Sequence, residues 1–306
     1  MSTEDGGKHR HAHPPAVSRR RFLWTGAALG ALIPAGAEIA DQLTGRGARA
    51  RAEARARRAP AVAEPNPSPA PAATTASPAV VGGPLTGKVV VIDPGHNPNN
   101  PGHVAQIDAL VNAGGFLKAC DTVGAETDAG YPEFDFTLDV ARRVRVILRA
   151  AGARVILTQN GRTGYGPCVT QRAAIGNRAH ADAAVSIHAD GGPPDGYGFA
   201  ILVPVLVRDS AADNSMIIGP SRRLADAMLT HFAAATGQVR STYLGSDGIQ
   251  PRSDLGGLNL SVVPKVFIEC ANMRNAADAA KVTDERWRHS AARGIADSLA
   301  AFVTAS

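Results

Sequence analysis

The chain has 306 residues, of which 32 are Lys or Arg and 27 are Asp or Glu, giving a net charge of +5. Eleven of the basic residues and six of the acidic ones precede Leu85, so the remaining 222 residues are neutral. A neutral region of this size argues against a nucleic-acid-binding domain. No apolar run reaches the ~18 residues of a membrane-spanning helix, and three cysteines are too few for a disulfide-built scaffold.

Residues 1–37 have the features of a twin-arginine export signal. Three arginines at positions 19–21 precede a moderately apolar stretch at 23–33, and the small residues Ala35 and Ala37 follow. This order predicts export to the periplasm, the cell wall or the medium, with cleavage after Ala37. The alternative is an Arg-rich patch beside a short buried helix.

Residues 38–84 have the composition of a disordered tether. Six arginines alternate with alanines between positions 46 and 58, and a Pro/Ala/Ser/Thr-rich stretch follows. Such a segment buries too little apolar surface to offset the entropy lost on ordering. The Arg/Ala stretch could instead form a transient helix at an anionic wall or membrane surface.

From residue 85 onward, strand-like and helix-like segments alternate. In chain order they are a strand at 88–93, a long Gly/Asn/Pro-rich segment at 94–132, a helix that ends before Gly152, a strand at 154–158, a helix at 171–181, strands at 184–188 and 199–203, a helix at 221–235, a strand at 265–269 and a helix at 285–300. This order predicts one α/β domain over 85–306, with a twisted, mostly parallel sheet flanked by helices. Loops as long as 94–132 are usually functional or disordered.

Polar side chains stand where three of these strands end. Asp93 and His96 end the first strand, His188 and Asp190 the third, and Glu269 the last. Ligands of open parallel sheets collect beyond the carboxyl ends of the strands, and a carboxylate there is costly to bury without a partner. Two histidines and a glutamate in one sheet favour a metal site over histidines that merely pack at the rim.

A catalytic zinc ion typically takes three protein ligands, so a third one is needed. Glu133 is the preferred candidate, because Pro132 fixes the start of its helix and the helix dipole favours a carboxylate there. Glu126, in a Gly/Thr/Asp loop, is the competitor, and His103 is a weaker one. Three further histidines are expected at the surface or in packing: His180, His231 and His289.

Together, in this order, these motifs resemble the zinc-dependent N-acetylmuramoyl-L-alanine amidases, and more narrowly the type-three amidase family of cell-wall hydrolases. The resemblance runs from about Lys88 to Val303. It implies one Zn²⁺ per chain at the carboxyl ends of the strands, with His96, Glu133 and His188 as ligands and Glu269 as the catalytic group.

The chain departs from the family pattern at two places. Asp190 stands where the family usually has Asn, and Cys270-Ala271-Asn272 follows the glutamate in place of a small residue, Gly and Phe. Both changes could alter contacts in the substrate groove. Asp93 has two open interpretations: a group behind the ligands that orients a histidine, or a cap of the turn.

The implied reaction is hydrolysis of the amide bond between N-acetylmuramic acid and L-alanine in peptidoglycan. The implied partners are peptidoglycan or muropeptides, and no nucleic acid. The enzyme is expected to be a monomer without a stable membrane span after export, and it could need an activator protein. A catalytically silent peptidoglycan-binding or regulatory module on the same fold is the alternative. A zinc peptidase of another type is disfavoured because the chain has no HExxH motif.

The cysteines fit an exported protein. Cys120 lies in the long loop and Cys168 in the turn before the next helix, and loop cysteines can pair in an oxidising compartment. We therefore predict a Cys120–Cys168 disulfide that pins the long loop, and a buried free thiol at Cys270.

Overall fold

The computed structural model describes residues 82–161, 164–208 and 210–305, all of which fall in one compact unit. The predicted export signal lies outside the described residues, and so does the predicted tether except for its last three residues, 82–84. None of the described helices is long and apolar enough to cross a membrane.

The central sheet has six strands. Its order is β4 (Arg154–Leu157), β1 (Val89–Pro94), β5 (Ala183–Asp190), β8 (Lys265–Asn272), β6 (Ala200–Pro204) and β7 (Ile249–Arg252). The first four strands are mutually parallel, whereas β6 runs antiparallel to β8 and parallel to β7. The predicted α/β fold with a mostly parallel sheet is therefore confirmed.

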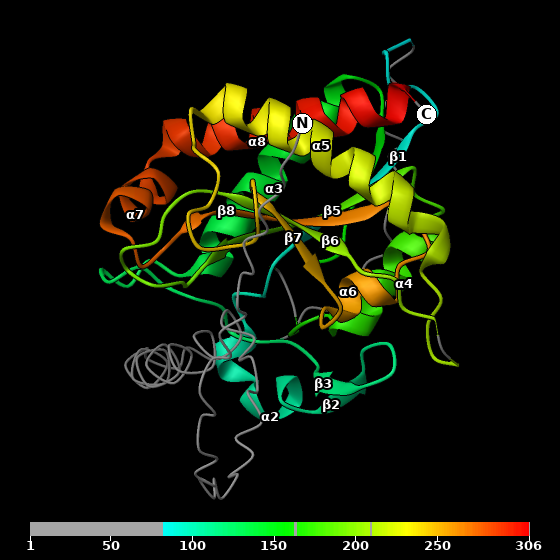
Figure 1. Ribbon diagram of the computed structural model, residues 1–306, viewed down its shortest axis with the longest axis horizontal. Coiled ribbons are helices and arrows are strands. Elements are labelled where there is room, and N and C mark those ends of the chain that lie inside the picture. The colour runs from blue at the N-terminus through cyan, green and yellow to red at the C-terminus, as the bar shows by residue number, and fades with distance from the viewer. Residues whose placement is uncertain (1–81, 162–163, 209, 306) are drawn as a thin grey trace, which may run out of the picture. The chain divides into compact units, whose positions relative to one another are not determined.

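Helices cover both faces of the sheet (Figure 1). On one face α3 (Glu133–Ala150) and α5 (Ile218–Thr236) both pack against α8 (Glu285–Thr304), and on the other α4 (Val169–Arg178) lies beside the short α6 (Gly256–Asn259). The helix α7 (Ala276–Thr283) follows β8, and a 3₁₀ turn at Ser215–Ile217 precedes α5.

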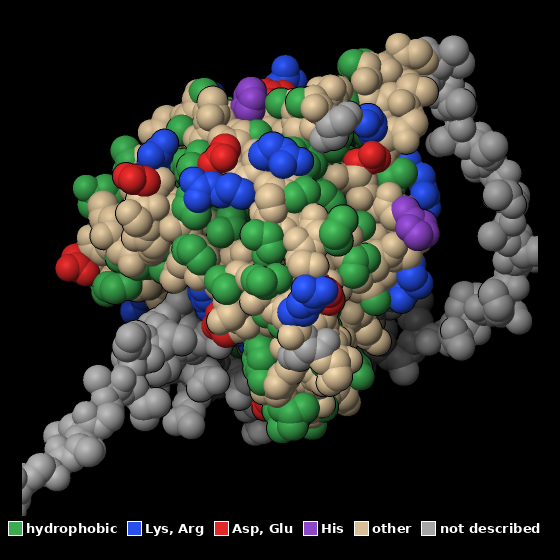
Figure 2. Space-filling model, turned by 45° about the vertical axis from the view of Figure 1, so that its right-hand side comes forward, with side chains coloured by type: hydrophobic (Ala, Val, Ile, Leu, Met, Phe, Trp, Pro, Cys, Tyr) green, Lys and Arg blue, Asp and Glu red, His purple; other side chains and the backbone are tan. Residues whose placement is uncertain are grey.

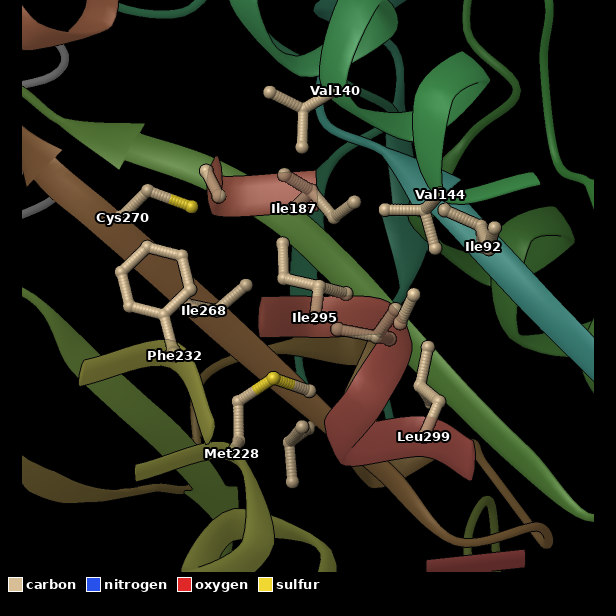
Figure 3. Packing of buried hydrophobic residues seen from close by; sticks show 14 of the residues in the cluster. Ile92, Val140, Val144, Ile187, Met228, Phe232, Ile268, Cys270, Ile295 and Leu299 are labelled. Atoms are coloured by element: carbon tan, nitrogen blue, oxygen red, sulfur yellow. The ribbon is translucent and has the colours of Figure 1, made fainter. Parts of the chain in front are cut away.

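The main core fills the space between the sheet and the first group of helices. Figure 3 shows Val140 and Val144 of α3 facing Ile92 and Ile187, with Ile295 of α8 beside them. The β-branched side chains of β1 and β5 suit strands buried on both faces. The site at the ends of these strands is therefore carried on a well-packed scaffold.

Local signals fix where several helices begin and end. Helix α3 starts directly after Pro132 and ends just before Gly152, whose φ of 98° stops it as predicted. Gly237, with φ of 64°, ends α5, which begins three residues earlier than predicted. The carboxylate of Asp284 accepts a hydrogen bond from the backbone N–H of Trp287 at 2.7 Å and caps α8.

The segment 94–132, expected to be one long loop, contains short regular elements. They are a 3₁₀ turn at Asn100–Gly102, α2 (Val104–Ile107) and an antiparallel hairpin of β2 (Leu110–Asn112) and β3 (Leu117–Ala119). The predicted disulfide Cys120–Cys168 is present and joins the end of this hairpin to the start of α4. Cys270 is a buried free cysteine, as predicted.

The described chain enters the domain next to the carboxyl-terminal end of α3. The backbone N–H of Leu85 donates to the carbonyl of Ala151 at 2.9 Å. Gly83 lies against the same carbonyl so closely that a Cβ there would be 2.2 Å from the oxygen. This entry point lies at the amino-terminal end of β1, away from the strand ends that carry the polar residues.

Candidate metal centre

Three of the predicted side chains converge at the carboxyl ends of β1 and β5. The Nε2 atom of His96 lies 3.0 Å from Oε2 of Glu133, and Nδ1 of His188 lies 3.0 Å from Oε1 of the same carboxylate. One ligand atom from each residue falls within 4.8 Å of the others. The two imidazole rings meet edge to face, with centroids 4.9 Å apart.

The backbone and a threonine set the orientation of His96. Its φ of 61° is in the left-handed region, which is uncommon for a residue other than glycine. Its Nδ1 lies 3.1 Å from the carbonyl oxygen and 3.0 Å from the hydroxyl of Thr122. With the Nδ1 proton donated to that carbonyl, the lone pair of Nε2 faces Glu133.

Arg172, on α4, holds the backbone behind His96. Its Nη2 donates to the carbonyl oxygen of His96 at 2.9 Å and to Asp121 at 2.7 Å, and its Nη1 donates to Asp93 at 2.8 Å. Its side chain is 6% exposed, so the ion pairs are shielded from water. Burial would lower the pKa of Arg172, but Asp121 and Asp93 raise it above the usual value.

Glu133 is almost fully buried and receives backbone hydrogen bonds in addition to the two imidazoles. The N–H of Ala125 donates to Oε2 at 2.8 Å, and that of Ala189 to Oε1 at 3.1 Å. Burial would raise the pKa of Glu133, but the charge that His96 carries when it is protonated, together with hydrogen bonds from both imidazoles, lowers it below the usual range. The carboxylate is therefore held in its ionised form.

Two glycines leave room for the ligands. A Cβ on Gly95 would lie 2.3 Å from Cε1 of His188, and one on Gly124 would lie 2.7 Å from Cδ2 of His96. On its other side, the ring of His188 stacks on Phe267, with centroids 5.4 Å apart. The histidines are therefore confined from several directions.

Glu269 lies beside this cluster on the neighbouring strand. Its Cα pairs with that of His188 in the β5–β8 register, and both residues line one pocket with Asp190. Its Oε2 is buried and has no hydrogen-bond partner among the described residues. Burial, followed by repulsion from Asp190 and Glu133, raises the pKa of Glu269 well above the usual value.

Asp93 faces the scaffold below the cluster. It accepts hydrogen bonds from Thr158 and Ser186, both at 2.6 Å, and pairs with Lys265 at 3.1 Å in addition to Arg172. Burial would raise the pKa of Asp93, but Lys265 and Arg172 lower it. Among its described contacts there is none to an imidazole, so it reaches His96 only through Arg172.

The other candidates stay away from the cluster. Glu126 forms an isolated bridge with Pro132, and the ring of His103 lies 5.2 Å from that of Tyr165. His180 and His289 are exposed and His231 is half-buried, as expected. The sequence interpretation missed Thr122 and Arg172. An arginine on the buried face of a helix, beside the small residues Ala173 and Gly176, was the available signal for Arg172, and Thr122 gave none.

The donor set fits a zinc ion. Two imidazole nitrogens and one carboxylate are the ligands of many catalytic zinc sites. A neutral His96 whose Nδ1 proton goes to Thr122 turns one acceptor, Nε2, toward another, Glu133, at 3.0 Å. Only a shared cation, either a proton or a metal ion, stabilises that arrangement.

A family model described as N-acetylmuramoyl-L-alanine amidase matches residues 90–301. The chain therefore belongs to this family. It is 38% identical over 222 residues to the N-acetylmuramoyl-L-alanine amidase Rv3717 of Mycobacterium tuberculosis, which covers 72% of this chain and 88% of that protein.

Solved structures agree with this assignment. The N-acetylmuramyl-L-alanine amidase Ami1 of Mycobacterium smegmatis has a TM-score of 0.67 and 41% identity, and the match covers 72% of this chain and 99% of that one. For the apo form of Ami1 from Mycobacterium abscessus the TM-score is 0.65 and the identity 39%, over 71% and 99% of the two chains. The family resemblance of the sequence is thus confirmed.

Proposed function

We propose that this chain hydrolyses the amide bond between N-acetylmuramic acid and L-alanine in peptidoglycan with one bound Zn²⁺. The observation that carries the proposal is the meeting of His96, Glu133 and His188, with Glu269 on the adjacent strand of the same pocket. Membership of the amidase family supplies the bond that is cleaved.

His96 would hold the ion through Nε2 and His188 through Nδ1, with Glu133 as the third ligand. When bound, zinc supplies a Lewis acid that activates water near neutral pH and polarises the scissile carbonyl. Glu269 takes the proton from the attacking water and returns it to the nitrogen of L-alanine, a role typically worth about 10²- to 10⁴-fold in rate. The raised pKa of Glu269 suits a group that must both accept and donate a proton.

Asp190 belongs to the groove beside Glu269. Its carboxylate is one of the charges that raise the pKa of Glu269. We assign Asp93 a structural role under the metal site, because its described partners are Arg172, Lys265 and two hydroxyl groups.

The location and partners follow from the same function. We infer that residues 1–37 direct twin-arginine export and that residues 38–84 tether a monomeric enzyme at the cell wall, in the periplasm or outside the cell. Peptidoglycan or its muropeptides are the substrate, and an activator protein could open the groove. On the face seen in Figure 2, basic and acidic side chains are interspersed.

The deciding experiment digests purified peptidoglycan with the zinc-loaded protein, with and without a chelator. We expect peptides that begin with L-alanine to be released, and release to stop with the chelator. Glu269→Gln should lose at least 10²-fold in kcat while still binding zinc. Absence of release by the folded, zinc-loaded wild type would favour the catalytically silent wall-binding module instead.

The ligand assignment has its own test in zinc binding measured by calorimetry. Glu133→Gln should lose most of the zinc affinity, whereas Glu126→Gln, the matched change at the competing carboxylate, should keep it. The reverse result would move the third ligand to Glu126.

A further inference from the structure

Two basic side chains line the pocket of the metal centre without belonging to it. Lys118 lies on β3 of the hairpin, and Arg252 is the last residue of β7. Both line the same pocket as His188 and Glu269. Lys118 and Arg252 are called the basic pair below. The charge of Arg252 opposes the rise in the pKa of Glu269, but neither side chain is assigned a proton-transfer step above.

Arg252 is fixed in place and has a donor to spare. Its Nε and Nη2 donate to the two carboxylate oxygens of Asp254, at 2.6 and 2.5 Å, in a bidentate pair. Its Nη1 has no hydrogen-bond partner among the described residues, although the side chain is only 9% exposed. A planar guanidinium held on two sides presents its remaining N–H groups in a fixed direction.

Lys118 stands beside this pair. Its Nζ donates to the backbone carbonyl of Asp254 at 3.2 Å. Burial lowers the pKa of Lys118 to about 8, with Asp254 opposing the shift and Arg252 adding to it. The surroundings therefore destabilise the ammonium charge, and an anion bound next to it would relieve that cost.

We propose that the basic pair is a subsite for a carboxylate of the peptide that leaves the zinc site. This rests on the proposed function, because the peptide is then the stem peptide of peptidoglycan. The residue after L-alanine in that peptide is a D-glutamate joined through its γ-carboxyl. Its α-carbon carries either a free carboxylate or, where the wall is amidated, a carboxamide.

The subsite distinguishes these two forms. A carboxylate can accept from Nη1 of Arg252 and from Nζ of Lys118, and it adds a negative charge beside two cations that share the single carboxylate of Asp254. A carboxamide supplies no charge, and its NH₂ group would face two donors. The enzyme is therefore selective for stem peptides with a free α-carboxylate next to L-alanine.

The test is a binding measurement with two matched tripeptides on the zinc-loaded full chain. They are L-Ala-γ-D-Glu-L-Lys with an α-carboxylate and the same peptide with an α-carboxamide, both cleavage products that the enzyme does not degrade. By calorimetry we expect the acid to bind roughly 10- to 100-fold more tightly than the amide. Lys118→Met should reduce this ratio to below about threefold.

Lys88→Met is the matched control, because Lys88 pairs with Asp182 at the amino-terminal start of β1 and should leave the ratio unchanged. Equal affinities in the wild type, binding of neither peptide, or an unchanged ratio in Lys118→Met would overturn the subsite. An equal loss for both peptides in Lys118→Met would also overturn it, since that result describes a structural lysine.

Turnover of the corresponding muramyl tripeptides decides the proposed function separately. No hydrolysis of either one, with the binding preference intact, would refute the amidase reaction and leave the subsite standing. Hydrolysis of both muramyl tripeptides without any preference in binding would support the amidase reaction and refute the subsite.

Discussion

The carbonyl oxygen of His96 accepts hydrogen bonds from Arg172 at 2.9 Å and from Gln159 at 3.0 Å. A backbone held in the left-handed region is costly for a histidine, so these donors stabilise a conformation that the residue would otherwise leave. Arg172 also binds Asp121, next to the threonine that orients the ring. One guanidinium thus fixes both the backbone and the surroundings of a metal ligand.

We therefore expect Arg172→Lys to lower zinc affinity roughly 10- to 100-fold, because a single ammonium cannot replace the fork of donors. Lys265→Met is the control: it removes another cation from Asp93 but none of the described contacts to His96. Both changes should reduce the thermal stability. Equal zinc affinity in the two variants, measured by calorimetry, would show that Arg172 only supports the fold.

Gly95 offers a second test at the residue scale. A methyl group in Gly95→Ala would overlap the ring of His188 at 2.3 Å and force it out of position. Zinc affinity should fall at least tenfold with little loss of secondary structure. Gly102→Ala, in the same segment but with open space around the added Cβ, is the matched control. Unchanged zinc binding in Gly95→Ala would show that the ring can move without cost.

At the scale of elements, the disulfide joins the hairpin to α4. Cys120 and Cys168 are 48 residues apart, and closing a loop of that length stabilises the fold by ~3–4 kcal/mol in the chain-entropy model. The double variant Cys120→Ser, Cys168→Ser should lose about that much free energy of unfolding in urea. Reduction of the wild type, whose sequence is unchanged, should cause a similar loss and separates the bridge from the effect of the two introduced hydroxyl groups. Equal stability of wild type and double variant would mean that the bridge contributes nothing.

The same scale shows what sequence patterns predict well. Runs such as Val89-Val90-Val91-Ile92 have enough β-branched residues to predict a buried strand from the local sequence alone. Strands of this kind also place His188 and Glu269 near the carboxyl ends of adjacent strands. Strand β7 was missed, because Pro251 and two polar residues leave almost no apolar pattern in it. It tolerates them as the edge strand of the sheet.

The basic pair could not be predicted for a related reason. Lys118 and Arg252 come from a three-residue strand and an edge strand, 134 positions apart, and neither element has a pattern that indicates its place. His96, His188 and Glu269, by contrast, stand at the ends of strongly apolar strands that are neighbours in the sheet. Functional residues at the ends of core strands can therefore be predicted from the sequence, whereas those on short surface elements can be identified only from the tertiary structure.

For the molecule as a whole, the buried carboxylate Asp93 predicts acid sensitivity. Its pKa in the folded state lies well below the usual value of 3.8, so the unfolded chain binds a proton more readily. The stability that it contributes is fully present above about pH 4 and is lost as the pH falls toward the folded pKa. The zinc-free protein should therefore lose free energy of unfolding steeply below about pH 4.

Asp93→Asn tests this in urea titrations of zinc-free protein, where metal release makes no contribution. The variant should be less stable at pH 7 and should show a shallower decline between about pH 4 and pH 2. Asp226→Asn, at a half-exposed ion pair on α5, should show the same decline in the free energy of unfolding with pH as the wild type. If Asp93→Asn kept the full slope, other carboxylates would have to account for the acid sensitivity.

The entry of the chain beside Ala151 has a consequence for how the enzyme faces its surroundings. Helix α3 begins in the metal centre at Glu133 and ends next to Leu85, so its 18 residues separate the two points by about 27 Å. The described chain therefore enters the domain at the end of α3 that is remote from the metal centre. An attachment at this entry point would therefore leave the metal centre, at the other end of α3, accessible to a large substrate.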